Sequence, residues 1–292
     1  MTNWRRMSAG PALDAILVTC DVSPWAEAQR VALLDALEAL HCNVEVASWD
    51  EQRDWGSAAG IVVVSPFNTA PLHDEFLAWV ERCEEQATLV NSAALLNLDS
   101  HRRYLFDLEA AGVPIVATRQ VAGDAPWQFQ RAVLRRFEGT VVMKPAVAAS
   151  KFGYGIGPAD SIDTMAHLEA LCLLGDAVIQ PYISTVDTVG VAQIVLLRGE
   201  VRHAVRKVRD VTVEHTVQPE EREVIAAALD ALPEIPVAAS VELVWVGDEP
   251  ALLSFDLVGP NLHAGASGSI VEQYARVLLD TIHRPRIGVV TP

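Results

Sequence analysis

The sequence is poor in positive charge and in long apolar runs, and each shortage excludes a class of function. Lysine and arginine number 22 against 38 aspartates and glutamates, which gives a formal net charge of −16. A surface of this sign repels nucleic acid and anionic lipid, so we expect neither as a partner. No apolar run approaches the roughly 20 residues that span a bilayer. A polyphosphate ligand would therefore need a local basic pocket.

Cysteine is also scarce, and its spacing is uninformative for metal or disulfide chemistry. The four residues, Cys20, Cys42, Cys83 and Cys172, lie far apart and form no C-x-x-C pair. This pattern indicates reduced, mostly buried thiols. The N-terminal stretch "MTNWRRMSAGPALDAILVTC" has a proline and an aspartate where a signal peptide would be apolar. Together these features predict a cytoplasmic protein.

Two common nucleotide motifs are missing as well. A P-loop, G-x-x-x-x-G-K-[ST], places its lysine after the glycines, whereas in "VVMKPAVAASKFGYGIG" (141–157) Lys144 precedes them. A Rossmann fingerprint would occupy the first strand-to-helix turn, but the turn "TCDVSPW" contains no glycine. The chain therefore has neither of the usual phosphate-binding loops.

What the sequence does contain is an alternation of strand and helix patterns. Apolar and alternating runs, with amphipathic stretches between them, predict a βαβ-type unit with a parallel sheet over residues 13–92. Helices are then expected at 99–112, 125–137 and 161–174, and strands at 113–121, 140–146 and 177–183. After residue 190 the pattern is mainly β, with a strand pair over 190–208, a helix that begins "EEREV", two strands at 237–246 and 250–259, and a last helix at 268–282.

Residues that carry chemistry follow one another in a defined order. Lys144 ends a strand, a glycine-rich loop (153–157) follows, residues 180–182 form a hinge between strands, and Glu242 and Asp256 lie on a late hairpin. The loop reads as a flexible flap. A lysine and loop amides suit phosphates, hinge backbone groups suit adenine, and carboxylate oxygens suit Mg²⁺.

In this order the residues resemble the ATP-grasp superfamily, and within it the small glutathione-synthetase-like ligases that include the D-cycloserine-forming enzyme. The resemblance covers roughly residues 14–285 and rests on segments such as "RRYLFDLEAAGVPIVAT", "VIQPYISTVDTVG", "GEVRHAVRKV" and "VELVWVGDEPALLSFDLVGPNL". It implies an α/β ATP-grasp fold with a pre-ATP-grasp domain (1–98), a central lobe that carries the glycine flap (99–182) and a C-terminal lobe that carries a metal hairpin (183–292).

The resemblance also implies cofactors, substrates and roles for single residues. ATP and Mg²⁺ would be the cofactors, a small carboxylate and an amine the substrates, and an acyl phosphate the intermediate; family members are often oligomers of one chain. The implied nucleotide-binding residues are Lys144, Arg102, Lys151, Gln180, Tyr182 and Asp187. The implied catalytic residues are Arg206 and Lys207, and the implied metal ligands are Glu242, Asp256 and Asn261.

Strand alternation sends Arg206 and Lys207 to opposite faces of a sheet, and we expect Arg206 to face the phosphates. His203, on the same strand, is either a site residue or a packed histidine.

Several positions depart from the family's pattern. Arg102 stands where a lysine is usual, and Glu242 where an aspartate is usual. Ser254, Asp256 and Gly259 stand where three carboxylates usually do. "VSPFNT" (64–69) replaces a segment that often shapes the substrate pocket. Two functions therefore remain open: an ATP-dependent carboxylate–amine ligase of specialised metabolism, or a degenerate relative that binds a nucleotide or a partner without ligating.

Overall fold

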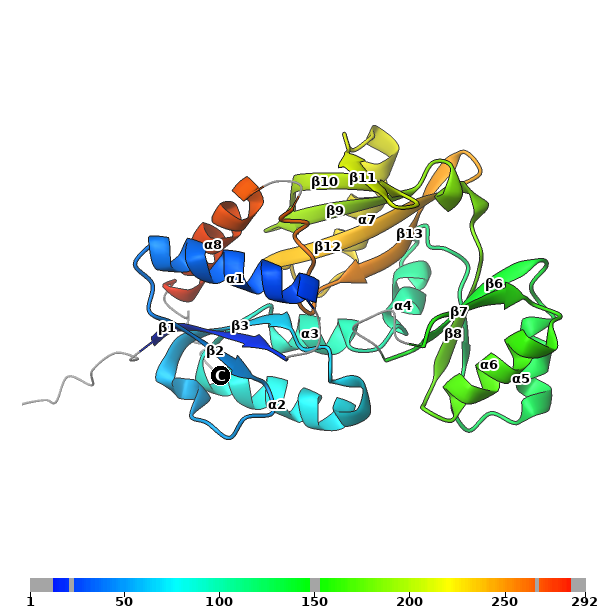
Figure 1. Ribbon diagram of the computed structural model, residues 1–292, viewed down its shortest axis with the longest axis horizontal. Coiled ribbons are helices and arrows are strands. Elements are labelled where there is room, and N and C mark those ends of the chain that lie inside the picture. Colours follow the sequence, from blue (N-terminus) through cyan, green and yellow to red (C-terminus); the bar gives the residue numbers. More distant parts are fainter. Residues whose placement is uncertain (1–12, 21–23, 148–152, 266–267, 285–292) are drawn as a thin grey trace, which may run out of the picture.

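Three β-sheets form the framework of the chain (Figure 1). The computed structural model describes residues 13–20, 24–147, 153–265 and 268–284. The first sheet is parallel, with the strand order β2-β1-β3-β4. Its strands are β1 (Leu13–Thr19), β2 (Val44–Ser48), β3 (Ala58–Ser65) and β4 (Thr88–Val90).

Helices cover both faces of the first sheet, which is why β1 and β3 are almost wholly apolar. One face packs against α1 (Pro24–Ala39) and α8 (Gly268–Ile282), which lie side by side. The other face packs against α2 (His73–Gln86) and α3 (Ala93–Asp99). The last helix of the chain thus returns to the first sheet.

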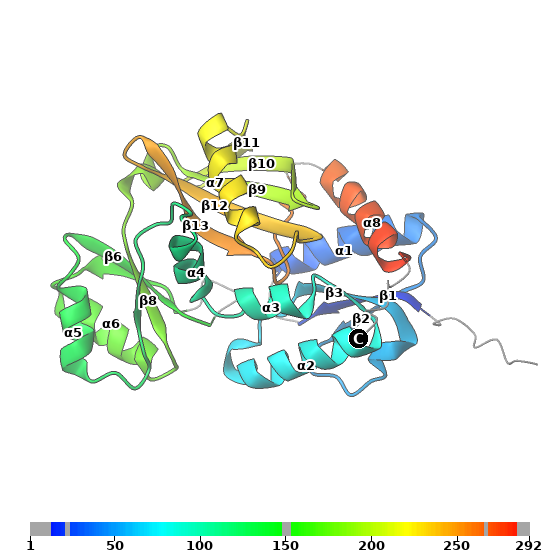
Figure 2. The ribbon, with the colours of Figure 1, turned by 180° about the vertical axis from the view of Figure 1, so that it is seen from behind.

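The second sheet is antiparallel and has the order β5-β8-β6-β7. Its strands are β5 (Arg119–Val121), β6 (Thr140–Pro145), β7 (Gly155–Pro158) and β8 (Ala177–Pro181). Two helices, α5 (Trp127–Leu134) and α6 (Ile162–Cys172), pack against one of its faces. Figure 2 shows this unit from behind, at the end of the molecule away from α1 and α8.

The third sheet is antiparallel with the order β11-β10-β9-β12-β13. Its strands are β9 (Val191–Leu197), β10 (Glu200–Val208), β11 (Val211–Glu214), β12 (Ala238–Val246) and β13 (Glu249–Asp256). One face packs against α4 (Tyr104–Ala110) and α7 (Pro219–Asp230). The predicted α/β class is confirmed, whereas the domain boundaries after residues 98 and 182 stay a prediction.

Three local features differ from the sequence prediction. The helix expected over 99–112 is shorter and is confined to α4, while α3, which precedes it, was not predicted; between the two the chain leaves helical geometry and the Arg102 N–H donates to Ala146 O at 2.8 Å. An edge strand, β11, occupies part of a stretch expected to be irregular. Part of the expected flexible flap is the strand β7, which pairs with β6.

The glycines of β7 allow close packing on α6 rather than free movement. A Cβ on Gly155 would lie 2.3 Å from the His167 ring, and a Cβ on Gly157 would lie 2.4 Å from Thr164 Oγ1. These approaches are possible only without a side chain. Among the described residues, no helix combines the length and the apolar character that crossing a membrane requires.

A buried ion pair ties α7 to the third sheet. The side chain of Glu221 is fully buried, and its carboxylate accepts hydrogen bonds from Arg206, His215 and Trp245 at 2.9, 2.7 and 3.2 Å. Burial alone would raise the pKa of Glu221. Hydrogen bonds from the Gln218 N–H and from His215, together with the charge of Arg206, outweigh burial and hold this pKa below its ordinary value.

We expect Glu221→Gln to destabilise the fold by about 3 kcal/mol at neutral pH, because it leaves the half-buried Arg206 without its carboxylate partner. The depressed pKa means that the ionised carboxylate stabilises the fold above the ordinary glutamate pKa of about 4.3. That contribution disappears as the pH falls through the depressed value, so the difference between wild type and variant should shrink there. Urea unfolding measures both effects. Glu223→Gln, at an exposed position of the same helix, is the control, and equal losses in the two variants would contradict the assignment.

Candidate functional site

A cavity of about 530 Å³ lies where the three sheets meet. Its walls come from one face of the second sheet, the facing side of the third sheet and the segment that follows β3 of the first. Segments that are far apart in the sequence thus share one space. This arrangement separates the cavity into an apolar part, a cationic part and an acidic part.

The apolar part lies between the second and third sheets, beside the hinge. Tyr182, whose N–H donates to Thr140 O at 2.8 Å, holds the hinge strand in place. The Tyr182 hydroxyl donates to Asp187 at 2.9 Å, and this bond is the main cause of its raised pKa. The apolar side chains that line this part are Val142, Ile156, Ile183, Val186, Val191, Val244 and Leu253.

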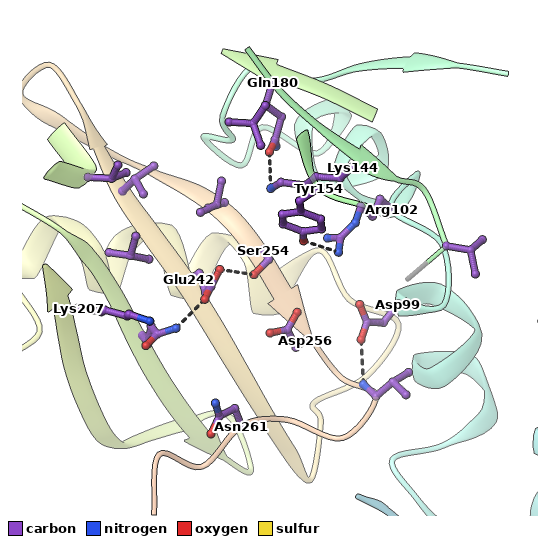
Figure 3. Close-up of a pocket in the computed structure, with 18 of the residues that line it drawn as sticks. Asp99, Arg102, Lys144, Tyr154, Gln180, Lys207, Glu242, Ser254, Asp256 and Asn261 are labelled. Carbon is purple, nitrogen blue, oxygen red and sulfur yellow. Dashed lines mark hydrogen bonds between the residues drawn. The ribbon is translucent and has the colours of Figure 1, made fainter. Parts of the chain in front are cut away.

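The cationic part is formed by Lys144 and Arg102, with Tyr154 beside them (Figure 3). Lys144 is buried and donates to Gln180 Oε1 at 2.7 Å, while Gln180 Nε2 donates to Thr118 at 3.0 Å. Gln180 therefore orients the lysine. Arg102 donates from Nε to Pro145 O at 3.2 Å and from Nη2 to the Tyr154 hydroxyl at 2.9 Å.

The acidic part faces these cations from the third sheet and from the end of α3. Glu242 accepts from Gln193 at 2.7 Å and from Ser254 at 3.2 Å, so both of its oxygens are held by neutral donors. Asp256 accepts a weaker bond from Ser240 at 3.3 Å. Asp99, which the sequence analysis did not single out, accepts the N–H groups of Leu257 and Val258 at 2.6 and 2.8 Å.

The pKa values of Asp256 and Asp99 are raised mainly by burial. Burial raises the pKa of Asp256 to about 8, and the charges of Asp99 and Glu242 act in the same direction. Burial also raises the pKa of Asp99, although the two backbone hydrogen bonds and Arg102 oppose it. Asp99 and Asp256 titrate as a pair. Added positive charge would therefore be stabilised here.

The donor set fits Mg²⁺ if a nucleotide supplies further ligands. Glu242, Asp256 and Asn261 all line the cavity and offer oxygen atoms, which Mg²⁺ prefers. Within the described ranges, however, no three acidic, histidine or cysteine side chains converge on a metal position. Mg²⁺ commonly keeps waters and phosphate oxygens beside one or two carboxylates.

The two adjacent basic residues of β10 face opposite ways. Lys207 lines the cavity, whereas Arg206 lies on the other face of the sheet in the ion pair with Glu221. The preference for Arg206 at the phosphates is thus at odds with its position, because strand alternation in this register directs residue 207 toward the cavity.

The remaining predicted residues have varied positions. Asp187 does not line the cavity, but it accepts a hydrogen bond from the hydroxyl of Tyr182, which does. Asn261 lines the cavity and accepts from the His263 N–H at 2.9 Å. The His203 Nε2 is buried and lacks a hydrogen-bond partner among the described residues, and burial lowers its pKa. Lys151 lies outside the described residues.

Gly259 explains one of the lost carboxylates. Its φ is +62°, and a Cβ there would lie 2.3 Å from the carbonyl oxygen of Val64. The end of β3 therefore occupies the space that a side chain at this position would need. Phe67 and Thr69, which follow β3 closely in the chain, line the same cavity.

We expect Gly259→Ala to destabilise the fold more than Gly247→Ala, as measured by urea unfolding. Gly247 has nearly the same φ, +65°, but nothing lies within 4 Å of its Cβ position. In each variant the left-handed backbone conformation lowers the free energy of unfolding by about 1 kcal/mol. At Gly259 alone, overlap of the new methyl group with Val64 lowers it by roughly a further 1–3 kcal/mol. Equal losses would show that the contact with Val64 does not constrain this position. Gly259→Glu is likewise expected to disturb the contact rather than restore a metal ligand.

Comparisons with known proteins find similar proteins that cover most of the chain. The family described as D-cycloserine synthetase DcsG, N-terminal domain, matches residues 15–91. The cycloserine biosynthesis protein DcsG of Streptomyces lavendulae is 28% identical over 295 residues, which span 91% of this chain and 98% of that protein. The crystal structure of D-cycloserine synthetase DcsG superposes with a TM-score of 0.82 at 26% identity, covering 92% of this chain and 99% of the other.

More distant structures share the fold. The D-alanine–D-alanine ligase of Bacillus anthracis has a TM-score of 0.67 at 13% identity, covering 93% of this chain and 97% of the ligase. A RimK domain ATP-grasp protein of Sphaerobacter thermophilus has a TM-score of 0.67 at 14% identity, covering 93% of this chain and all of its own. The chain therefore has the fold of these ATP-grasp ligases and is similar over most of its length to D-cycloserine synthetase DcsG.

Proposed function

We propose that the protein is an ATP- and Mg²⁺-dependent ligase that activates a small carboxylate as an acyl phosphate and joins it to an amine. The observation that carries the proposal is the single cavity in which an apolar slot, two buried cations and a set of carboxylates meet in this order. The names of its relatives, D-cycloserine synthetase and D-alanine–D-alanine ligase, support a small amino-acid-like substrate.

The apolar slot suits the adenine ring of ATP. The slot lies between two sheets. One sheet contributes Val142 and Ile156, and the other contributes Val191, Val244 and Leu253. A ring bound there lies beside the hinge strand, whose backbone is fixed to β6 by hydrogen bonds. Base recognition in such a slot depends on burial and a few backbone contacts.

The two sides of the cavity would divide the charges of the phosphates. Lys144 and Arg102 would donate to phosphate oxygens from the second sheet, and Lys207 from the third. Glu242, Asp256 and Asn261 would hold Mg²⁺, which supplies charge neutralisation for the phosphates when it is bound. Positioning and electrostatic stabilisation provide most of the catalysis in phosphoryl transfer, and fixed cations meet both needs.

The proposed reaction has two steps. A substrate carboxylate oxygen bonds to the γ-phosphorus as the bond to the bridging oxygen of ADP breaks. The amine nitrogen then bonds to the acyl carbon, the carbon–oxygen bond to phosphate breaks, and the amine gives up a proton. Phe67, Thr69 and Ser100 line the end of the cavity next to Asp99 and Asp256, where these substrates would lie.

A second function is favoured by one observation. Both oxygens of Glu242 already accept hydrogen bonds within the protein, as expected for a carboxylate that no longer binds metal. On this hypothesis the chain binds a nucleotide but does not ligate. Calorimetry of ATP with and without Mg²⁺, followed by an assay of ADP release with D- and L-amino acids, separates the two. ATP binding without any Mg²⁺ effect would favour the second function, and an absence of ATP binding would contradict both.

We expect Asp256→Asn to remove the Mg²⁺-dependent part of ATP affinity, a loss of about tenfold or more. The variant replaces the carboxylate that lies nearest Asp99 and Arg102 but keeps its size. Asp248→Asn, on the exposed turn of the same hairpin, is the matched control. Calorimetry with Mg²⁺ or with EDTA gives both affinities. If Asp256→Asn kept the full Mg²⁺ effect, Asp256 would not be a ligand.

The raised pKa of Asp256, about 8, gives a pH dependence. Below that pH the carboxyl is mostly protonated, whereas a bound cation favours its ionised form. Mg²⁺–ATP binding near pH 7 should therefore release a proton, and affinity should rise as the pH approaches 8. Calorimetry in buffers of different ionisation enthalpy measures the release. Asp256→Asn should abolish it, and proton release that persisted in this variant would assign it to another group.

A further inference from the structure

Tyr154 lies opposite Lys144 in the β6–β7 hairpin. The register pairs Val142 with Ile156 and Met143 with Gly155, where β7 begins, and continued by one residue it sets Tyr154, which directly precedes β7, opposite Lys144. Opposite residues of antiparallel strands place their side chains on the same face. Val142 and Ile156 line the apolar slot, and two residues advance a strand by about 7 Å. Tyr154 is therefore one step beyond the slot, level with the buried lysine.

The Tyr154 side chain contacts both cations of the site. Its ring centre lies 5.3 Å from Lys144 Nζ and 5.7 Å from the Arg102 guanidinium carbon, within the range of cation–π attraction. Its hydroxyl accepts a hydrogen bond from Arg102 Nη2 at 2.9 Å (Figure 3). An electron-rich ring beside two like charges reduces their repulsion. Tyr154 thus favours the convergence of Lys144 and Arg102 before any anion is bound.

The backbone on both sides of Tyr154 is clamped to α6. The His167 ring lies 2.9 Å through Nε2 from Gly153 O, and it also fills the position that a Cβ on Gly155 would take. Gly157 is packed equally closely on Thr164. The backbone of Tyr154 is therefore held in place on both sides, and its side chain forms part of the cavity wall.

The hydroxyl of Tyr154 retains a proton that it can donate. A phenol oxygen that accepts from arginine still has its own O–H, and no acceptor for it lies in the part of the chain that the structure describes. Burial raises the pKa of Tyr154, and Glu242 and Asp256 add to that effect against the opposing charge of Arg102. The group is thus protonated at neutral pH.

We propose that Tyr154 is a phosphate-binding residue of this site: its hydroxyl donates to a phosphate oxygen of the nucleotide, while its ring and oxygen position Lys144 and Arg102 for the same group. This inference rests on the proposed nucleotide function. It adds a third donor to the two cations, from a segment that the sequence presents only as a glycine-rich loop. The ligand chemistry is a polyphosphate, independent of the base.

The test is calorimetry with three probes, which are Mg²⁺–ATP, Mg²⁺–tripolyphosphate and adenosine. Each is titrated into wild type, Tyr154→Phe and Tyr274→Phe. The control variant removes a buried hydroxyl from α8, outside the cavity. Tyr154→Phe should weaken the binding of ATP and tripolyphosphate by about tenfold, the usual effect of one hydrogen bond to a charged group. Adenosine should bind both variants as it binds wild type.

The possible outcomes separate this inference from the proposed function. ATP affinity in Tyr154→Phe equal to or tighter than in wild type would overturn the inference, since the hydroxyl would then be idle or would block the phosphate position. An equal loss for adenosine would also overturn it, because the effect would then be general. Wild type that binds adenosine but neither phosphate probe would instead overturn the proposed ligase.

Discussion

The contact between Gly259 and the main chain of Val64 is the constraint on which the site depends. It seats the end of β3 against the segment that follows β13, and a side chain at residue 259 would separate them. Asn91 adds a second tie, because its amide bonds with the backbone of Val237, Ala238 and Leu257. The carboxylate of Asp99 adds a third, through Leu257 and Val258. The first sheet thus becomes the third wall of the cavity.

This close packing gives a physical reason for the unusual ligand set. A glutamate cannot fit at residue 259, because its Cβ would overlap the backbone of Val64. The glycine instead allows β3 to pack closely against this segment. Ser254 has become a hydrogen-bond donor to Glu242 rather than a charged neighbour. Fewer negative charges are then confined in a small volume, which limits the repulsion that adds to burial in raising the pKa of Asp256.

The opposite wall has the complementary problem of two buried cations. Lys144 is held by Gln180 and Arg102 by Tyr154, and neither partner carries a charge. Burying cations costs free energy that neutral hydrogen bonds only partly offset. The cavity therefore presents cationic side chains on one side and carboxylates on the other. A metal–polyphosphate complex matches both, since it presents anionic oxygens to one wall and a cation to the other.

Parts of this site could be inferred from sequence because they follow from order and periodicity. Lys144 at a strand end, the hinge at Gln180 and the hairpin with Glu242 and Asp256 are all visible as local patterns. Tyr154 was not predicted, because in the sequence it stands within a glycine-rich segment and its position beside Lys144 depends on how the hairpin pairs. The choice between Arg206 and Lys207 depended on which face of β10 meets α7. No local pattern specifies that face, because both residues are basic and adjacent.

The sequence by itself determined the α/β class, the three successive sheets and the order of the chemistry-bearing residues, because hydrophobic periodicity and motif order are local properties. Only the tertiary structure decided which of these residues meet. Asp99 lies in the site because α3 ends beside the segment that follows β13. Residue 259 has no room for a side chain because β3 lies against it. Both depend on contacts between segments more than 150 residues apart, which alternation along a single strand or helix cannot encode.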